Sequence, residues 1–134
     1  MTQEHKMLLI KDLSSRLPYA VHVQHISGVN GILHDISIRH KYDGNDNIYD
    51  AICYTDFLKD GDSIVIEHFK PYLFPLSTMT DNQKQEYQYI TERWMYDSSY
   101  SISDSIDWLN KNHFDYRNLI DKNLAIDATG LNIY

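Results

Sequence analysis

The sequence is poor in cysteine and in long apolar stretches. Cys53 is its only cysteine, so no intramolecular disulfide can form. No apolar run approaches the roughly 18 residues that a membrane-spanning helix needs, and the segment Met1–Lys6 lacks the charged and apolar regions of a secretion signal. These absences predict a protein of the reducing cytoplasm that is neither secreted nor membrane-spanning.

Motifs that would identify catalysis, a metal site or a nucleotide site are also missing. His22 and His25 are three residues apart, a spacing that places their rings on opposite faces of a strand. The segment Gly28–Gly31 lacks the Gly-Lys-Ser/Thr of a phosphate-binding loop, and residues 43–47 lack the ligand order of an EF-hand. Cys53 lies in an apolar stretch that indicates a buried, inert thiol. We therefore predict no metal, no cofactor and no catalytic residue.

Basic residues are outnumbered by acidic ones. The chain has 12 lysines and arginines against 19 aspartates and glutamates, which gives a formal net charge of −7. Such a charge disfavours direct contact with a nucleic-acid backbone and favours a basic protein as the partner. The hydrophobic content of 43% is ordinary for a globular protein, and the length of 134 residues suits one domain over residues 1–134.

The first half of the chain has the pattern of a helix followed by a small sheet. Apolar residues at helical spacing predict a helix over residues 4–17, which Pro18 ends. Residues 19–67 predict a mostly antiparallel sheet of about four strands, open or closed into a barrel, with a surface loop at 41–47. The expected strands cover residues 19–26, 32–40, 48–57 and 63–67. Alternation in the second strand places one set of side chains on one face, namely Ile32, His34, Ile36, Ile38 and His40.

The second half, residues 80–123, predicts two to three helices, so that the fold class is α+β. Prolines at both ends of residues 71–75 indicate an extended segment at the edge of the core. Capping-box spacing at 80–83 predicts a helix over residues 81–95. The same spacing at 101–104 predicts a second helix that ends near Asn112.

The closing residues 113–123 have two interpretations. In the first, Phe114 docks against the core, Asp115 caps a last helical turn and Asn123 ends that turn in a left-handed conformation. This interpretation is favoured because it explains every residue of the motif except Arg117. In the second interpretation, four side chains form a binding site, namely His113, Asp115, Tyr116 and Arg117.

Tyrosine is abundant, with 11 residues in the chain. Tyr87 and Trp94 follow the apolar stripe of the helix over residues 81–95, so packing against the core accounts for them. Tyr89, Tyr96 and Tyr100 fall off that stripe. They are either single exposed aromatic residues, which are common, or a surface that binds another protein.

Three segments resemble known sequences: Leu8–Pro18, Lys70–Thr80 and Ile106–Ala125. They are similar to short uncharacterised proteins carried by Bacteroidales genomes, prophages and mobile elements. In that group a glycine often occupies the positions of Asn118 and Asn123. The group has no established activity, so the resemblance implies a bacterial or phage-infected bacterial cell as the setting and no particular chemistry.

Taken together, these features favour a non-enzymatic binding or regulatory protein that contacts another protein. A specific form of this hypothesis is a phage or mobile-element factor that inhibits or modulates a nucleic-acid-handling enzyme. One alternative is a small-ligand-binding protein or enzyme with a pocket of histidine, aspartate and tyrosine side chains. A second alternative is a virion or assembly component, and self-association is left open.

Overall fold

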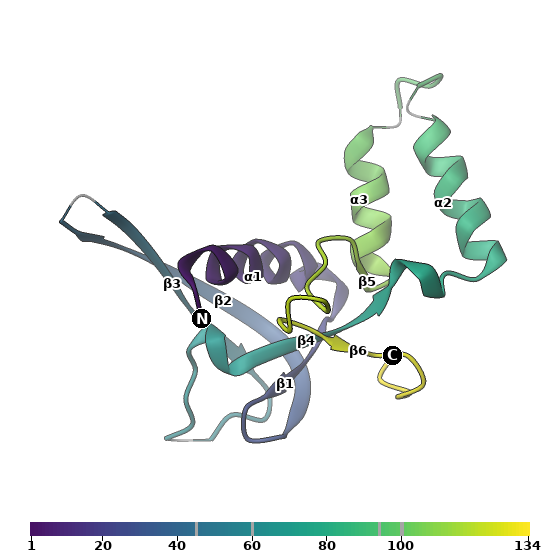
Figure 1. Cartoon of the computed structure of the whole chain (residues 1–134). Coiled ribbons are helices and arrows are strands. Elements are labelled where there is room, and N and C mark those ends of the chain that lie inside the picture. Colours follow the sequence, from purple (N-terminus) through teal and green to yellow (C-terminus); the bar gives the residue numbers. More distant parts are fainter. Residues whose placement is uncertain (45, 60, 94, 100) are drawn as a thin grey trace.

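A computed structural model of the chain describes residues 1–44, 46–59, 61–93, 95–99 and 101–134, apart from the side chains of residues 41–43 and 46–48. Its elements are an N-terminal helix, a mixed sheet and a helical hairpin (Figure 1). In the sequence the hairpin lies between the fourth and fifth strands. Their bounds are α1 Gln3–Arg16, β1 His22–His25, β2 Asn30–Asp43, β3 Asp46–Thr55, β4 Phe69–Pro75, α2 Asp81–Arg93, α3 Ile102–Lys111, β5 Phe114–Asp115 and β6 Ile126–Asp127. Single 3-10 turns lie at Leu17–Tyr19, Ile66–His68 and Leu76–Thr78.

Helix α1 confirms the predicted N-terminal helix. The Thr2 hydroxyl caps it by accepting the His5 backbone N–H at 3.1 Å. Leu9 and Leu13, one turn apart, are fully buried against the sheet, because the helical period brings them to the same face. Pro18 lies in the 3-10 turn that follows the helix.

The sheet is larger and more mixed than the sequence predicts. Its strand order is β3-β2-β1-β4-β5, with β6 paired to β4. Strands β1 to β4 pair in antiparallel fashion, whereas β5 and β6 both run parallel to β4. The expected number of about four strands is therefore wrong, and the barrel alternative is also wrong because β3 and β5 end an open sheet.

Strand β2 contains a bulge that changes which side chains face the core. The register with β3 shifts between Leu33 and Asp35, so His34 is the extra residue. As a result Leu33 is buried and Ile36 packs against the same cluster, although the two are an odd number of residues apart. The single face expected for alternate residues from Ile32 to His40 is thus interrupted. The loop expected at 41–47 is also mostly strand, since β2 reaches Asp43 and β3 starts at Asp46.

Strand β4 replaces the strand that was predicted at residues 63–67. Only Val65 of that segment makes a bridge, to Ile52, and a 3-10 turn follows. Ile26 N–H donates to the His68 carbonyl at 2.8 Å. In an antiparallel pair only every second residue turns its backbone N–H and C=O towards the neighbouring strand, so counting from His68 these residues have even numbers and Pro71 is not one of them. Pro71 points its nitrogen away from β1, and β4 loses no hydrogen bond to β1 through the missing N–H.

Helices α2 and α3 form an antiparallel hairpin that projects from the sheet (Figure 1). Both predicted capping boxes are present: Gln83 N–H donates to the Thr80 hydroxyl at 3.1 Å, and Ser101 N–H donates to the Asp104 carboxylate at 2.6 Å. The hairpin is anchored at its base, where Trp108 stacks between Tyr87 and Phe114 at ring-centroid distances of 5.5 and 5.8 Å.

The third predicted helix is absent from the described residues 113–123. Turns follow β5 instead and lead the chain into β6. Asn118 and Asn123 both have φ of 59°, the left-handed region in which asparagine and glycine are favoured. Two left-handed residues five positions apart are incompatible with a regular helix, although Asn123 does adopt the stop conformation that was expected.

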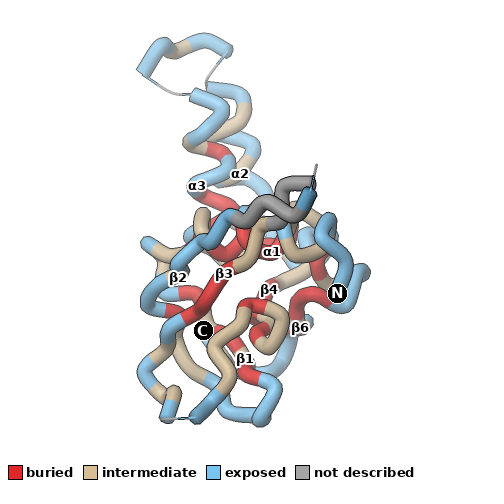
Figure 2. Tube along the Cα trace, turned by 90° about the vertical axis from the view of Figure 1, so that its left-hand side faces the viewer, coloured by how far each residue is buried: buried red, intermediate tan, exposed pale blue. Residues whose placement is uncertain are grey.

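Buried side chains form three clusters: one between α1 and the sheet, one where the turns of residues 119–125 pack on β4, and one at the base of α3. Figure 2 shows buried segments in the body of the molecule and an exposed trace along the far end of the hairpin. No helix among the described residues is long and apolar enough to cross a membrane.

Candidate functional site

The far end of the helical hairpin carries the exposed tyrosines. We call residues 89–93, 95–99 and 101–107 the hairpin tip. None of the 13 residues of α2 is buried. Tyr89 and Tyr96 are 50% and 83% exposed, and together with Glu92 and Arg93 they line a shallow hollow of about 360 Å³. The structure therefore brings these two predicted residues together, while Tyr100 and Trp94 lie outside the described residues.

Arg93 organises the hollow. Its guanidinium carbon lies 4.6 Å from the centroid of the Tyr89 ring, a cation–π geometry that holds the ring in place. The Asp97 carboxylate accepts the Ser99 backbone N–H and hydroxyl at 2.9 and 2.8 Å, and these bonds lower the pKa of Asp97. The loop after α2 thus carries a fixed negative charge beside the tyrosines.

The hairpin tip is both apolar and acidic. Met95, Ile102 and Ile106 add exposed fractions of 64%, 64% and 39%. The tip contains four acidic residues and one basic residue, which gives it a net charge of −3; they are Glu92, Asp97, Asp104, Asp107 and Arg93. Exposed apolar groups within a charged rim are the composition of many protein-binding surfaces.

The second predicted group, residues 113–117, lies at the other end of α3 and faces inward. Asp115 is 6% exposed, and its carboxylate accepts the backbone N–H groups of Leu119 and Ile120, both at 2.9 Å. Tyr116 donates its hydroxyl to the Asn110 side-chain oxygen at 2.8 Å. These contacts agree with the docking interpretation, except that Asp115 caps a turn rather than a helix.

Arg117, which the docking interpretation left unexplained, completes a buried ion-pair network. Asp12 is fully buried and accepts bonds from Arg16 Nε at 2.8 Å and Arg117 Nη1 at 2.9 Å. Arg16 also donates to the Phe114 carbonyl at 2.7 Å. The network joins α1 to a segment more than 90 residues away, so these charges hold the fold together.

His113 is enclosed in an aromatic stack. Its ring lies parallel to that of Tyr134 at a centroid distance of 3.6 Å, and Tyr134 donates its hydroxyl to the Tyr72 carbonyl at 2.8 Å. Burial lowers the pKa of His113 to about 4, with smaller effects from the charges of Arg16 and His22. His113 is thus a neutral packing residue at pH 7.

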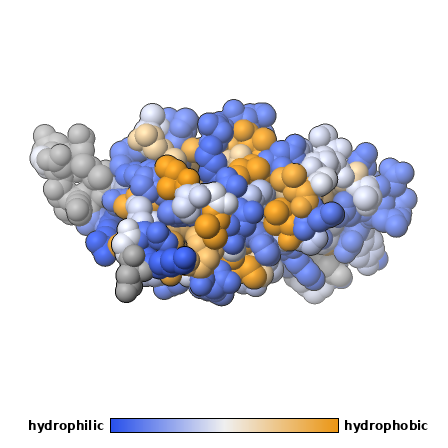
Figure 3. All heavy atoms as spheres, turned by 90° about the horizontal axis from the view of Figure 1, so that it is seen from below, coloured by the Kyte–Doolittle hydropathy of each residue, from blue (hydrophilic) through white to orange (hydrophobic). Residues whose placement is uncertain are grey.

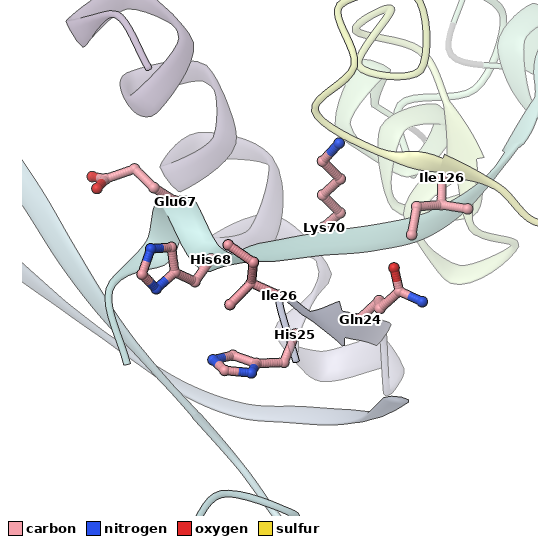
Figure 4. A pocket seen from close by; sticks show the side chains of 7 residues that line it. All are labelled: Gln24, His25, Ile26, Glu67, His68, Lys70 and Ile126. Carbon is pink, nitrogen blue, oxygen red and sulfur yellow. The ribbon is translucent and has the colours of Figure 1, made fainter. Parts of the chain in front are cut away.

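A second hollow lies on the sheet and involves residues that the sequence analysis did not select. It has a volume of about 370 Å³ and is lined by Gln24, His25, Ile26, Glu67, His68, Lys70 and Ile126. Figure 4 shows four of these side chains on one side of Lys70 and two on the other. The four are His25, Ile26, Glu67 and His68, and the two are Gln24 and Ile126. From below, apolar patches lie among hydrophilic side chains (Figure 3). Local spacing gives no signal for this hollow, because β1 and β4 are distant in sequence.

The described residues contain no group of three or more His, Cys, Asp or Glu side chains arranged to hold a metal ion. Burial raises the pKa of the Cys53 thiol to about 12, which leaves it protonated and unreactive at pH 7. Comparison of the chain with models of protein families, with curated proteins and with solved structures finds no match.

Proposed function

We propose that this protein is a non-enzymatic binding protein that contacts a basic protein surface through its hairpin tip. The observation that carries the proposal is that α2 has no fully buried residue, while Tyr89 of α2 and Tyr96 of the following turn are exposed. A helix gains most of its stability in a protein from burying one face. Tyr87 and Ile90 of α2 are only partly buried against the base of α3, and the rest of the helix faces solvent. The exposed aromatic side chains are therefore best explained by a surface that a partner covers.

The chemistry of the tip supports a protein partner. Tyrosine provides rigid contact area and loses little side-chain entropy on binding, and it is enriched among the residues that dominate binding energy. The local charge of −3 would accelerate association with a basic surface and select against acidic ones. Salt would then weaken the complex by slowing association.

The sequence resemblance supplies a setting for such a partner. In a phage or mobile element, a basic enzyme that handles nucleic acid would offer a positively charged channel. A small acidic protein that occupied this channel would inhibit or modulate the enzyme. This form of the proposal depends on the resemblance, whereas binding to a basic protein depends on the tip alone.

The test is affinity capture from lysate of a Bacteroidales bacterium, followed by mass spectrometry at low and high salt. Wild type is compared with the double variant Tyr89→Ser/Tyr96→Ser. The control is Tyr54→Ser, which removes a tyrosine that is 42% exposed on β3, away from the hairpin. Wild type and control should capture the same basic protein in stoichiometric amounts, and the double variant should lose it.

The captured protein is then purified and its affinity for the three forms is measured by calorimetry. Loss of two interface tyrosines is expected to weaken binding at least about thirtyfold, given more than 1 kcal/mol for each hot-spot residue. Equal capture by wild type and the double variant would refute the tip as the binding surface. If wild type is recovered from the lysate without any bound protein, this result would count against a tight host partner.

A further inference from the structure

The side chain of Tyr134 joins β1 to β4 at the point where the pairing of these strands ends. The last paired residues are Val23 and Pro71. At the next position, the His22 backbone N–H donates to the Tyr134 hydroxyl at 3.0 Å, and that hydroxyl donates to the Tyr72 carbonyl at 2.8 Å. The hydroxyl thus links the two backbones one residue beyond the ladder.

The position of this hydroxyl is chemically selective. The group placed there must accept a hydrogen bond from an N–H and donate one to a C=O. A hydroxyl does both, whereas a carboxylate only accepts and an ammonium only donates. The backbone of β1 and β4 therefore favours an alcohol or a phenol at this point.

Aromatic rings surround the Tyr134 ring. The His113 ring is stacked on it at a centroid distance of 3.6 Å, the His22 ring meets it edge-on at 5.0 Å, and the Phe74 ring is tilted at 5.9 Å. Burial lowers the pKa of His113 to about 4, so the stacked ring is neutral at pH 7. Because aromatic rings favour stacked and edge-on contacts, these walls favour a phenol over an aliphatic alcohol.

The segment that carries Tyr134 is otherwise weakly attached. We call residues 130–134 the strap. Ala128, before the strap, donates its N–H to the Leu73 carbonyl at 2.8 Å, whereas the Leu131 N–H bonds only within the turn, to the Ala128 carbonyl at 3.1 Å. Leu131 is 50% exposed. Among the described residues, the two bonds of the Tyr134 hydroxyl are the only hydrogen bonds from the strap to the sheet.

We propose that the slot between His22, Tyr72, Phe74 and His113 is a binding site for a para-substituted phenol, and that Tyr134 is its tethered ligand. The strap closes the site, and release of Tyr134 opens it to the phenol of another molecule. That phenol is either the tyrosine side chain of a peptide or a free small molecule, which present the same ring and hydroxyl. The proposal is independent of the hairpin tip, because none of the residues that line the slot belongs to α2 or α3.

The test is a titration of the isotope-labelled protein with 4-methylphenol and with toluene, followed by amide resonances in NMR spectra. Tyr134→Ala empties the slot, and 4-methylphenol should bind this variant with a dissociation constant on the order of 1 mM. The amides of residues 22 and 72–74 should shift to saturation. Toluene has the same ring but no hydroxyl, so it should bind at least about tenfold more weakly.

Wild type and Leu131→Ala are the matched controls, because both keep Tyr134 in the slot. They should bind 4-methylphenol at least about tenfold more weakly than Tyr134→Ala, which corresponds to a strap that is open no more than about a tenth of the time. A peptide of residues 132–134 distinguishes the two sources of the phenol. Tighter binding of the peptide than of 4-methylphenol to Tyr134→Ala supports a tyrosine side chain as the ligand, and the reverse order supports a free phenol.

A second variant covers the case in which Tyr134→Ala does not fold. Tyr134→Phe keeps the ring and loses both hydrogen bonds, so 4-methylphenol should displace it and bind several-fold more tightly than to wild type. Unchanged amide resonances of α1 establish that a variant is folded. Equal affinity of 4-methylphenol for wild type and the folded variants, equal binding of toluene and 4-methylphenol, or no saturable shift in any variant would each overturn the proposal.

Discussion

At the scale of single residues, the decisive feature is the sharing of one buried carboxylate by two arginines. Asp12 and Arg16 have no exposed side-chain surface, and the Arg117 side chain is 16% exposed. Taking these charges out of water is expensive, and their mutual hydrogen bonds, with the bond from Arg16 to the Phe114 carbonyl, offset that cost. The identity of residue 12 should therefore matter far more than that of any surface aspartate.

The first prediction concerns Asp12→Asn. This change leaves Arg16 buried without a counter-charge, and we expect the free energy of unfolding in urea at pH 7 to fall by about 3–5 kcal/mol. Asp107→Asn, at an exposed position on α3, should change it by less than about 0.5 kcal/mol. Equal stability of Asp12→Asn and wild type would mean that the network contributes nothing to folding.

The second prediction concerns the pH dependence caused by His113. The native pKa is about 4, against an ordinary value of 6.5, so between these pH values only the unfolded chain binds the proton. Stability should fall as pH decreases from 6.5 towards 4, by about 1–2 kcal/mol after allowance for solvent screening.

The measurement is urea unfolding of wild type and His113→Asn at pH 7 and pH 4.5. Asparagine tolerates the φ of 61° at this position but does not titrate, so the variant should lose this component of the pH dependence. The comparison uses the difference between the two pH values, because the variant also lacks the stack on Tyr134. Identical pH dependence in both proteins would contradict the assignment to His113.

At the scale of elements, local signals predict helix boundaries well and strand identity poorly. The caps at Thr80 and Ser101 involve residues three positions apart, and both form as expected. Residues 63–67 have a higher β propensity than residues 69–75, yet the second segment is the strand. Pairing with β1, β5 and β6 decides this outcome, because strand propensity depends on the neighbours that a segment finds.

The third prediction concerns α2, whose stability should be local. It buries no residue, whereas α1 buries Leu9 and Leu13 completely. Backbone amides of α2 should therefore exchange with solvent at least about ten times faster than those of α1. Hydrogen-exchange mass spectrometry measures this ratio.

Thr80→Ala is the control for that experiment. Loss of the cap should speed exchange in α2 further and leave α1 unchanged. Equal protection of the two helices in the isolated protein would show that α2 is stabilised without burial, and it would weaken the case for a partner.

At the scale of the whole molecule, charge and shape separate two surfaces. The hairpin tip is acidic and projects from the body, while the hollow with Lys70 lies on the sheet. A net charge of −7 opposes contact with a phosphate backbone over any broad face. The one lysine that lines the hollow, Lys70, is too small a basic area to reverse that effect.

The fourth prediction follows from this charge. A duplex of about 30 base pairs should not be retarded in a gel by about 10 μM protein at low salt, because non-specific affinity comes from phosphate neutralisation. A basic protein of similar size serves as the positive control. Retardation that disappears on addition of salt would contradict the prediction and redirect attention to nucleic acid itself.

The sequence alone determined the features that depend on neighbours a few residues away or on composition. These are α1, the two capped helices, the turn after β1, the absence of a disulfide and the acidic charge. Tertiary structure decided the features that join distant residues: the Arg117 bond to Asp12 across 105 positions, the bulge that buries Leu33, and the hollow that brings β1, β4 and β6 together. The division has a physical cause, because capping and turn formation are local equilibria, whereas burial and strand pairing depend on what the rest of the chain places alongside.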